Sequence, residues 1–142
     1  MNAEKREELI QEHEEALIRV FIKKERRERY RTQLNLIKKR PAFLDRLSHR
    51  FPDDIDARSQ QNPVLLADVN AEWTGQVTSD HPCVVLALED RFDRRVIVVD
   101  ALRSQLVDAS FGILVSVIPG KLVFYRDELA REVIVLRNRA RN

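Results

Sequence analysis

The residues whose types most clearly indicate a binding function form a basic stretch at positions 23–40. Their ammonium and guanidinium groups could contact a phosphate backbone, and Tyr30 could stack on a nucleic-acid base. Two acidic residues interrupt the stretch, and Tyr30 stands at helical spacing to Leu34, which favours a core position for it. The basic side chains are Lys23, Lys24, Arg26, Arg27, Arg29, Arg31, Lys38, Lys39 and Arg40.

Charge is distributed unevenly along the chain, although the net charge is only +2. Residues 23–50 hold eleven bases and three acids, a net of +8, whereas residues 51–109 hold eleven acids and five bases, a net of −6. A basic segment of this kind can form a polyanion site. Alternatively, it is an ordinary solvated helix face, or it is neutralised by the acidic segment within the fold or across a dimer.

The motif His81-Pro82-Cys83 contains the side chains of a thiol nucleophile and its base. Such chemistry requires the imidazole beside the thiolate in space, which adjacency in sequence does not supply. Cys83 also opens an apolar run, where a cysteine usually behaves as a small buried hydrophobe. The motif therefore predicts no catalytic residue.

Carboxylates offer a second kind of chemistry, because several converging oxygens can bind a divalent cation. His13 shares a helix face with Glu8 and Glu12, but a di-iron site needs matching motifs on further helices. We predict no metal ligand and no cofactor site, and a small metal-dependent hydrolase is the weakest of three functional hypotheses. Its acids would be those around the first expected strand: Asp80, Glu89, Asp90 and Asp93.

The elements that position these residues begin with a stretch free of glycine and proline, residues 1–40, which favours helix. The second apolar set, Tyr30, Leu34 and Ile37, lies almost opposite the first on a continuous helix. Either the chain breaks within 23–29 to give a helical hairpin, or one long helix presents two faces; we favour the break. The first set comprises Leu9, Ile10, His13, Ala16, Leu17, Val20 and Phe21.

A third short helix follows Pro41, which is tolerated at a first helical position. Residues 52–62 read as a polar connector. Asn62 and Pro63 then resemble an N-cap and a first helical residue, which predicts a helix near 63–74 that ends at Gly75.

Beyond Gly75 the chain becomes rich in β-branched residues and turn signals. A short helix, about 100–109, is expected after Asp100, and Ile113–Ile118 reads as a central strand. Pro119-Gly120 suits a type II turn in a loop wider than two residues. We expect an outer strand at Val133–Leu136.

These patterns predict an α+β fold with N-terminal helices at about 3–50 and a mainly antiparallel sheet of about four or five strands. The length of 142 residues suits a single domain, 1–142. It would comprise a helical subregion, 1–51, and an α+β subregion, 63–142, joined by the connector.

Composition restricts the classes of function. The single cysteine excludes an internal disulfide, and the acidic N-terminus lacks the apolar segment of a signal peptide, so we expect a cytoplasmic protein without a membrane or small-molecule partner. Our main hypothesis is a non-enzymatic interaction or structural module that self-associates through its N-terminal helices, because two out-of-phase apolar stripes exceed what one small sheet is expected to cover. The alternative is nucleic-acid or polyanion binding through residues 23–40.

Overall fold

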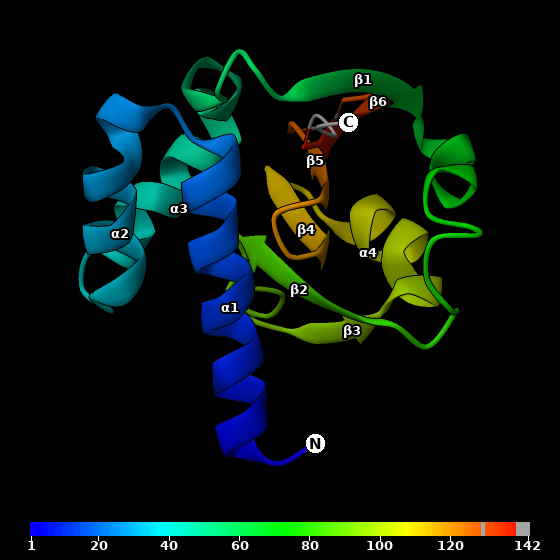
Figure 1. Ribbon diagram of the computed structural model, residues 1–142, viewed down its shortest axis with the longest axis horizontal. Helices are drawn as coiled ribbons and strands as arrows, with labels where there is room; N and C mark the ends of the chain where they lie inside the picture. Colours follow the sequence, from blue (N-terminus) through cyan, green and yellow to red (C-terminus); the bar gives the residue numbers. More distant parts are fainter. Residues whose placement is uncertain (129, 139–142) are drawn as a thin grey trace.

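The computed structural model describes residues 1–128 and 130–138, which form an α+β fold (Figure 1). The helices are α1 (Ala3–Phe21), α2 (Arg27–Asn35), α3 (Arg40–His49) and α4 (Leu102–Asp108). Short 3-10 helices are η1 (Lys24–Arg26), η2 (Phe51–Asp54), η3 (Leu66–Glu72) and η4 (Val99–Ala101). The strands are β1 (Gln60–Leu65), β2 (Pro82–Ala87), β3 (Val96–Val98), β4 (Ile113–Ile118), β5 (Leu122–Arg126) and β6 (Glu132–Arg137).

Within the described residues the strands make one antiparallel sheet of six, in the order β1-β6-β5-β4-β2-β3. Helices α1, α2 and α3 cover one face of this sheet, whereas α4 and η3 cover the other (Figure 1). Strand β4 is buried on both faces, as predicted for Ile113–Ile118.

The predicted break within residues 23–29 is confirmed, since α1 ends at Phe21 and α2 begins at Arg27. Between them the chain pairs with the end of η2 and the residues that follow it. Lys23 N–H donates to the Asp54 carbonyl at 2.8 Å, and Asp56 N–H donates to the Phe21 carbonyl at 2.7 Å. This short pairing fixes the angle at which the hairpin of α1 and α2 turns.

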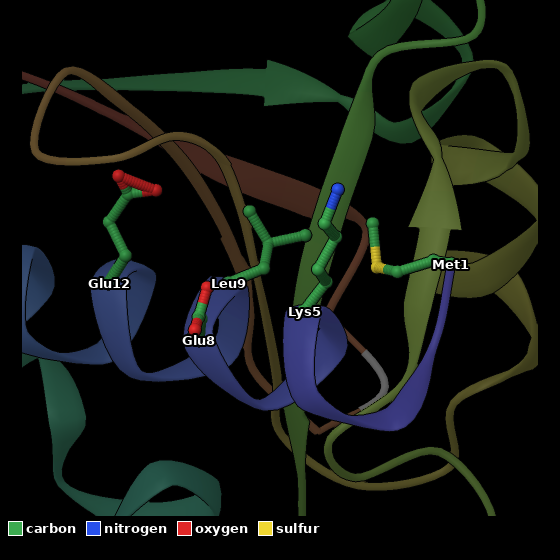
Figure 2. Close-up of a pocket in the computed structure, with 5 residues that line it drawn as sticks. All are labelled: Met1, Lys5, Glu8, Leu9 and Glu12. Atoms are coloured by element: carbon green, nitrogen blue, oxygen red, sulfur yellow. The ribbon is translucent and has the colours of Figure 1, made fainter.

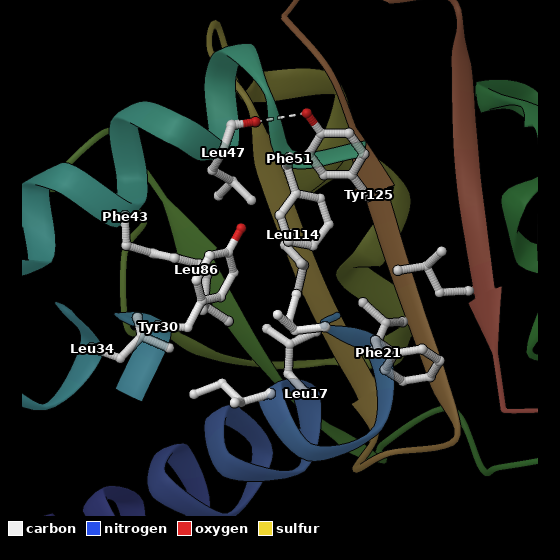
Figure 3. Close-up of a cluster of buried hydrophobic side chains, with 14 of the residues drawn as sticks. Leu17, Phe21, Tyr30, Leu34, Phe43, Leu47, Phe51, Leu86, Leu114 and Tyr125 are labelled. Atoms are coloured by element: carbon white, nitrogen blue, oxygen red, sulfur yellow. Dashed lines mark hydrogen bonds between the residues drawn. The ribbon is translucent and has the colours of Figure 1, made fainter. Parts of the chain in front are cut away.

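Because the chain turns back at this joint, the two opposed apolar stripes face one core (Figure 3). Leu17 and Phe21 from α1 lie in the same buried cluster as Tyr30 and Leu34 from α2. Ile37, the last member of the second stripe, lies outside this core and is 89% exposed. The core position expected for Tyr30 is thus confirmed.

The expected helix near 63–74 is wrong in its first half, because residues 60–65 form strand β1 and only 66–72 are helical, as η3. Pro63, read as a first helical residue, lies in this edge strand, where a missing N–H is tolerated. Strand β1 pairs with β6 along its whole length. The segment 133–136 is therefore not outermost, and the polar connector is shorter than predicted.

Smaller differences concern the termini of elements. The short helix at about 100–109 is present, but Ala101 rather than Asp100 precedes α4, and no side chain caps it.

Between β4 and β5 the turn contains Gly120 at a φ of +70°, and Lys121 N–H donates to the Ile118 carbonyl at 2.9 Å. Ile118 pairs with Leu122, so the loop is wider than two residues, as predicted.

Helix α3 approaches the start of β4 so closely that only glycine fits at position 112. Gly112 N–H donates to the Ser48 hydroxyl at 3.1 Å. The Tyr125 hydroxyl also donates to the Leu47 carbonyl at 2.6 Å (Figure 3). A Cβ at position 112 would lie 2.5 Å from the Leu47 carbonyl oxygen and 2.7 Å from Ser48 Cα.

We therefore expect Gly112→Ala to lower the free energy of unfolding by about 2 kcal/mol, since the added methyl must push backbone rather than a side-chain tip. Urea denaturation followed by circular dichroism measures the effect. A variant as stable as the parent would show that α3 can move away without loss.

Candidate functional site

The structure divides the nine predicted basic residues into two groups. Four of them form ion pairs within the chain: Arg26, Arg27, Arg31 and Arg40. Arg31 pairs with Glu15 on α1 and with Glu28 on its own helix, but the other three reach acids of the segment 51–109. Internal neutralisation of the basic stretch, one of the alternatives above, thus applies to part of it.

Asp54 is the main acid in this neutralisation, and it is 1% exposed. Tyr30 O–H donates to its Oδ2, Arg46 donates to both carboxylate oxygens, and Arg26 Nε lies 3.6 Å from Oδ1. Burial alone would raise the pKa of Asp54, but the hydrogen bonds from Arg46 and Tyr30 outweigh it and hold this pKa below its usual value. Tyr30 is buried with its hydroxyl occupied, so it offers no face to a base.

Arg40 is also a structural residue rather than a surface base, because it is only 6% exposed. Its Nε lies 2.7 Å from Asp93 Oδ2, and its Nη2 lies 2.8 Å from Glu14 Oε2. Burial disfavours its charge, yet the bonds to these two carboxylates raise its pKa. Arg40 thereby connects α1, α3 and the turn between β2 and β3.

The other five of the nine basic residues have no ion-pair partner among the described residues: Lys23, Lys24, Arg29, Lys38 and Lys39. Two of these, Arg29 and Lys39, border a pair of adjoining hollows between α2 and α3, of about 450 and 350 Å³. We call this surface the basic face and define it by Arg29, Gln33, Lys39, Arg46, His49 and Arg50.

The charges on the basic face favour an anion. Arg29, Lys39 and Arg50 have no acidic partner in the part of the chain that the structure describes. The two acids that also border the hollows, Glu28 and Asp45, lie near Arg31 and His49 respectively. The surface can therefore attract phosphate or carboxylate groups.

Gln33 adds a polar group to the basic face. It borders both hollows, and its Oε1 is buried without a hydrogen-bond partner among the described residues. An amide can present either its oxygen or its NH₂ group after rotation, so Gln33 can bond a partner that carries donors or acceptors.

Sequence reasoning missed the contribution of α3 to this surface. Arg46, His49 and Arg50 share the side of α3 that faces α2, and their spacing of three and four residues was the available signal. Local spacing does not show how α3 packs against α2, and it is this packing that brings Arg46, His49 and Arg50 to the same hollow as Arg29.

The thiol of Cys83 is buried, as the sequence predicted, and burial raises its pKa to about 12. The neighbouring imidazole does not serve it, since His81 Nε2 lies 2.7 Å from the Val117 carbonyl oxygen. A thiolate is thus strongly disfavoured at this position.

The four acids around β2 do not converge. Asp93 is bound to Arg40, Glu89 accepts from Ser110 N–H at 3.2 Å, and Asp80 accepts from the Thr78 hydroxyl at 2.6 Å. Among residues 1–128 and 130–138 no group of three or more histidines, cysteines and acids is placed to hold a metal ion. The hydrolase hypothesis gains no geometric support from them.

His13 and Ser116 make a buried pair that local sequence patterns did not reveal. His13 Nδ1 lies 2.7 Å from Ser116 Oγ, which resembles the arrangement of a base and a hydroxyl nucleophile. The two residues are only 2% and 1% exposed, so a substrate has no access to them. Their contact joins α1 to β4 and is structural.

A third hollow lies along α1 and has a volume of about 420 Å³ (Figure 2). Met1, Lys5 and Leu9 project to the same side of the helix there. The remaining residues bordering it are the acids Glu8 and Glu12. Since every bordering residue comes from the N-terminal segment and one base meets two acids, the hollow favours no particular ligand.

Comparison with known proteins finds no matching family model, no matching curated protein and no matching solved structure. None of the helices in the described residues combines the length and apolar character that crossing a bilayer requires. Of the surfaces described above, the basic face offers the most specific chemistry.

Proposed function

We propose that this chain is a non-enzymatic binding module that takes an anionic partner on its basic face. The observation that carries the proposal is the meeting of Arg29, Lys39 and Arg50 around the hollows between α2 and α3, each without an internal ion-pair partner among the described residues. Ion pairing inside the fold accounts for the other arginines of the stretch.

Two properties of the surface support this function. The long side chains of Arg29 and Arg50 can bond phosphate or carboxylate oxygens in pairs, which gives orientation as well as attraction. Lys39 can act as a point charge at the other end of the surface. Because these groups are solvent-exposed, the attraction is screened by salt.

Removal of the three bases is expected to reduce the salt-sensitive part of the binding. The slope of log affinity against log salt concentration is negative, and we expect it to become shallower by about 3 in the triple variant Arg29→Gln, Lys39→Gln, Arg50→Gln. Fluorescence anisotropy with labelled duplex DNA and single-stranded RNA, used as polyanion probes at several salt concentrations, measures this slope.

A matched triple variant provides the control for net charge. Arg103→Gln, Lys121→Gln and Arg131→Gln remove three exposed bases outside the basic face. This variant is expected to keep most of the affinity. Equal losses in both variants would mean that the binding reflects general charge, and the absence of any salt-sensitive binding in the parent chain would refute the proposal.

Self-association through the N-terminal helices remains a prediction. That prediction assumes an uncovered apolar stripe, but both stripes contribute to the chain's own core, apart from Ile37. An interaction module that binds its partner by charge needs no second copy.

A further inference from the structure

The turn between α2 and α3 exposes two aliphatic side chains side by side. Ile37 is 89% exposed and Leu36 is 49% exposed. The turn lies at the end of the hairpin opposite the joint with α1 (Figure 1). Exposing two neighbouring aliphatic side chains to water at such a tip is unfavourable in free energy. This suggests that they are buried in an apolar phase when the protein is bound to its partner.

The backbone of this turn is hydrogen-bonded on either side of its most exposed residue, Ile37. Leu36 N–H donates to the Thr32 carbonyl at 3.2 Å, and the N–H groups of Lys39 and Arg40 both donate to the Leu36 carbonyl, at 2.8 and 3.0 Å. A backbone that enters an apolar phase must have such groups paired. These bonds hold the turn in place, and because only side chains need to enter the apolar layer, the backbone at Ile37 can stay at the level of the polar headgroups.

Two basic residues adjoin the exposed pair in the sequence, and one of them, Lys39, belongs to the basic face. Lys38 and Lys39 follow Ile37 directly, and both are exposed without an ion-pair partner among the described residues. Lysine can lay its methylene chain beside an apolar group while its ammonium reaches a charged headgroup.

Resting on the proposed anion binding, we infer that the partner of the basic face is the surface of an anionic phospholipid bilayer. Leu36 and Ile37 insert into its interfacial layer, while Lys38, Lys39 and Arg29 contact the headgroups. Peripheral membrane proteins commonly combine these two interactions: insertion of apolar side chains and electrostatic attraction of basic side chains to anionic lipids. It departs from the sequence-based expectation of no membrane partner.

Two other partner classes fit the tip less well. Two aliphatic side chains on a convex turn offer far less area than a stable protein interface, which buries about 800 Å² on each partner. Single-stranded nucleic acid prefers exposed aromatic rings for stacking, and Tyr30 in this region is buried. A bilayer accepts a single protruding isoleucine.

The test is co-sedimentation with vesicles of phosphatidylcholine alone and of phosphatidylcholine mixed with phosphatidylglycerol. The parent chain is expected to bind only the mixed vesicles. The double variant Leu36→Ser, Ile37→Ser is expected to bind them at least about tenfold more weakly, since it loses the apolar insertion. Its salt-sensitive binding to DNA in the anisotropy assay should be unchanged, because the bases remain.

A second double variant, Leu65→Ser with Val107→Ser, controls for the loss of exposed aliphatic surface, since these residues are 56% and 52% exposed elsewhere. It should bind the mixed vesicles like the parent. If the parent binds DNA but not mixed vesicles, or if the Leu36→Ser, Ile37→Ser variant binds vesicles fully, the membrane inference is overturned and the proposed function stands. If the parent binds neither vesicles nor DNA, both fail.

Discussion

Replacing Asp54 with alanine is expected to lower the free energy of unfolding by about 3–4 kcal/mol, the cost of breaking a largely buried ion pair. The carboxylate is 1% exposed and accepts hydrogen bonds from Tyr30 and Arg46. Without it, the Tyr30 hydroxyl loses its acceptor inside the core, and Arg46 loses its acidic partner. Urea denaturation followed by circular dichroism gives the free energy directly.

The neighbouring residue supplies the control. Asp53 is exposed and forms no ion pair among the described residues, so Asp53→Ala is expected to change the free energy of unfolding by less than about 0.5 kcal/mol. If Asp54→Ala proved as mild as Asp53→Ala, the packing of the hairpin would not depend on this carboxylate.

Acid is expected to destabilise the fold through His13 before most carboxylates are protonated. Burial in the core, with a smaller effect of nearby His81, lowers the pKa of His13 from 6.5 to about 4. Between these values the unfolded chain binds a proton that the folded chain does not. The stability supplied by neutral His13 is therefore complete above pH 6.5 and is lost as the pH falls toward 4, a loss of about 3 kcal/mol in total.

The measurement is the free energy of unfolding against pH for the parent chain and for His13→Asn. The variant keeps a polar side chain opposite Ser116 but has no titrating group at this position. Its stability is expected to change less steeply over this interval. Parallel profiles for the two chains would show that His13 does not control the acid response.

Local patterns predicted the elements whose residues signal their own structure. The phase difference between Leu17 and Tyr30 predicted the break at the joint, and the apolar run Ile113–Ile118 predicted the central strand. Strand β1 had no such signal, because its sequence contains polar residues and Pro63. It becomes a strand by pairing with β6, about seventy residues later, and a contact so distant in sequence leaves no local pattern.

The candidate site was predictable only in part for the same reason. The excess of bases in residues 23–40 was visible, but not which of them the fold would neutralise. Arg40 finds Asp93, 53 residues away, and Arg26 finds Asp54. The contribution of Arg50 to the basic face likewise depends on how α3 packs against α2.

The position of Pro63 in β1 also determines where the sheet stops. Backbone groups along an antiparallel strand point alternately to either side. Leu66 N–H donates toward β6, to the Arg131 carbonyl, so the nitrogen of Pro63, three residues earlier, points away from the sheet. A strand from another molecule aligned beside β1 would find no donor at its centre, and at the opposite edge β3 offers only three residues. Both edges of the sheet are thereby poor templates for edge-to-edge association with the sheet of another molecule.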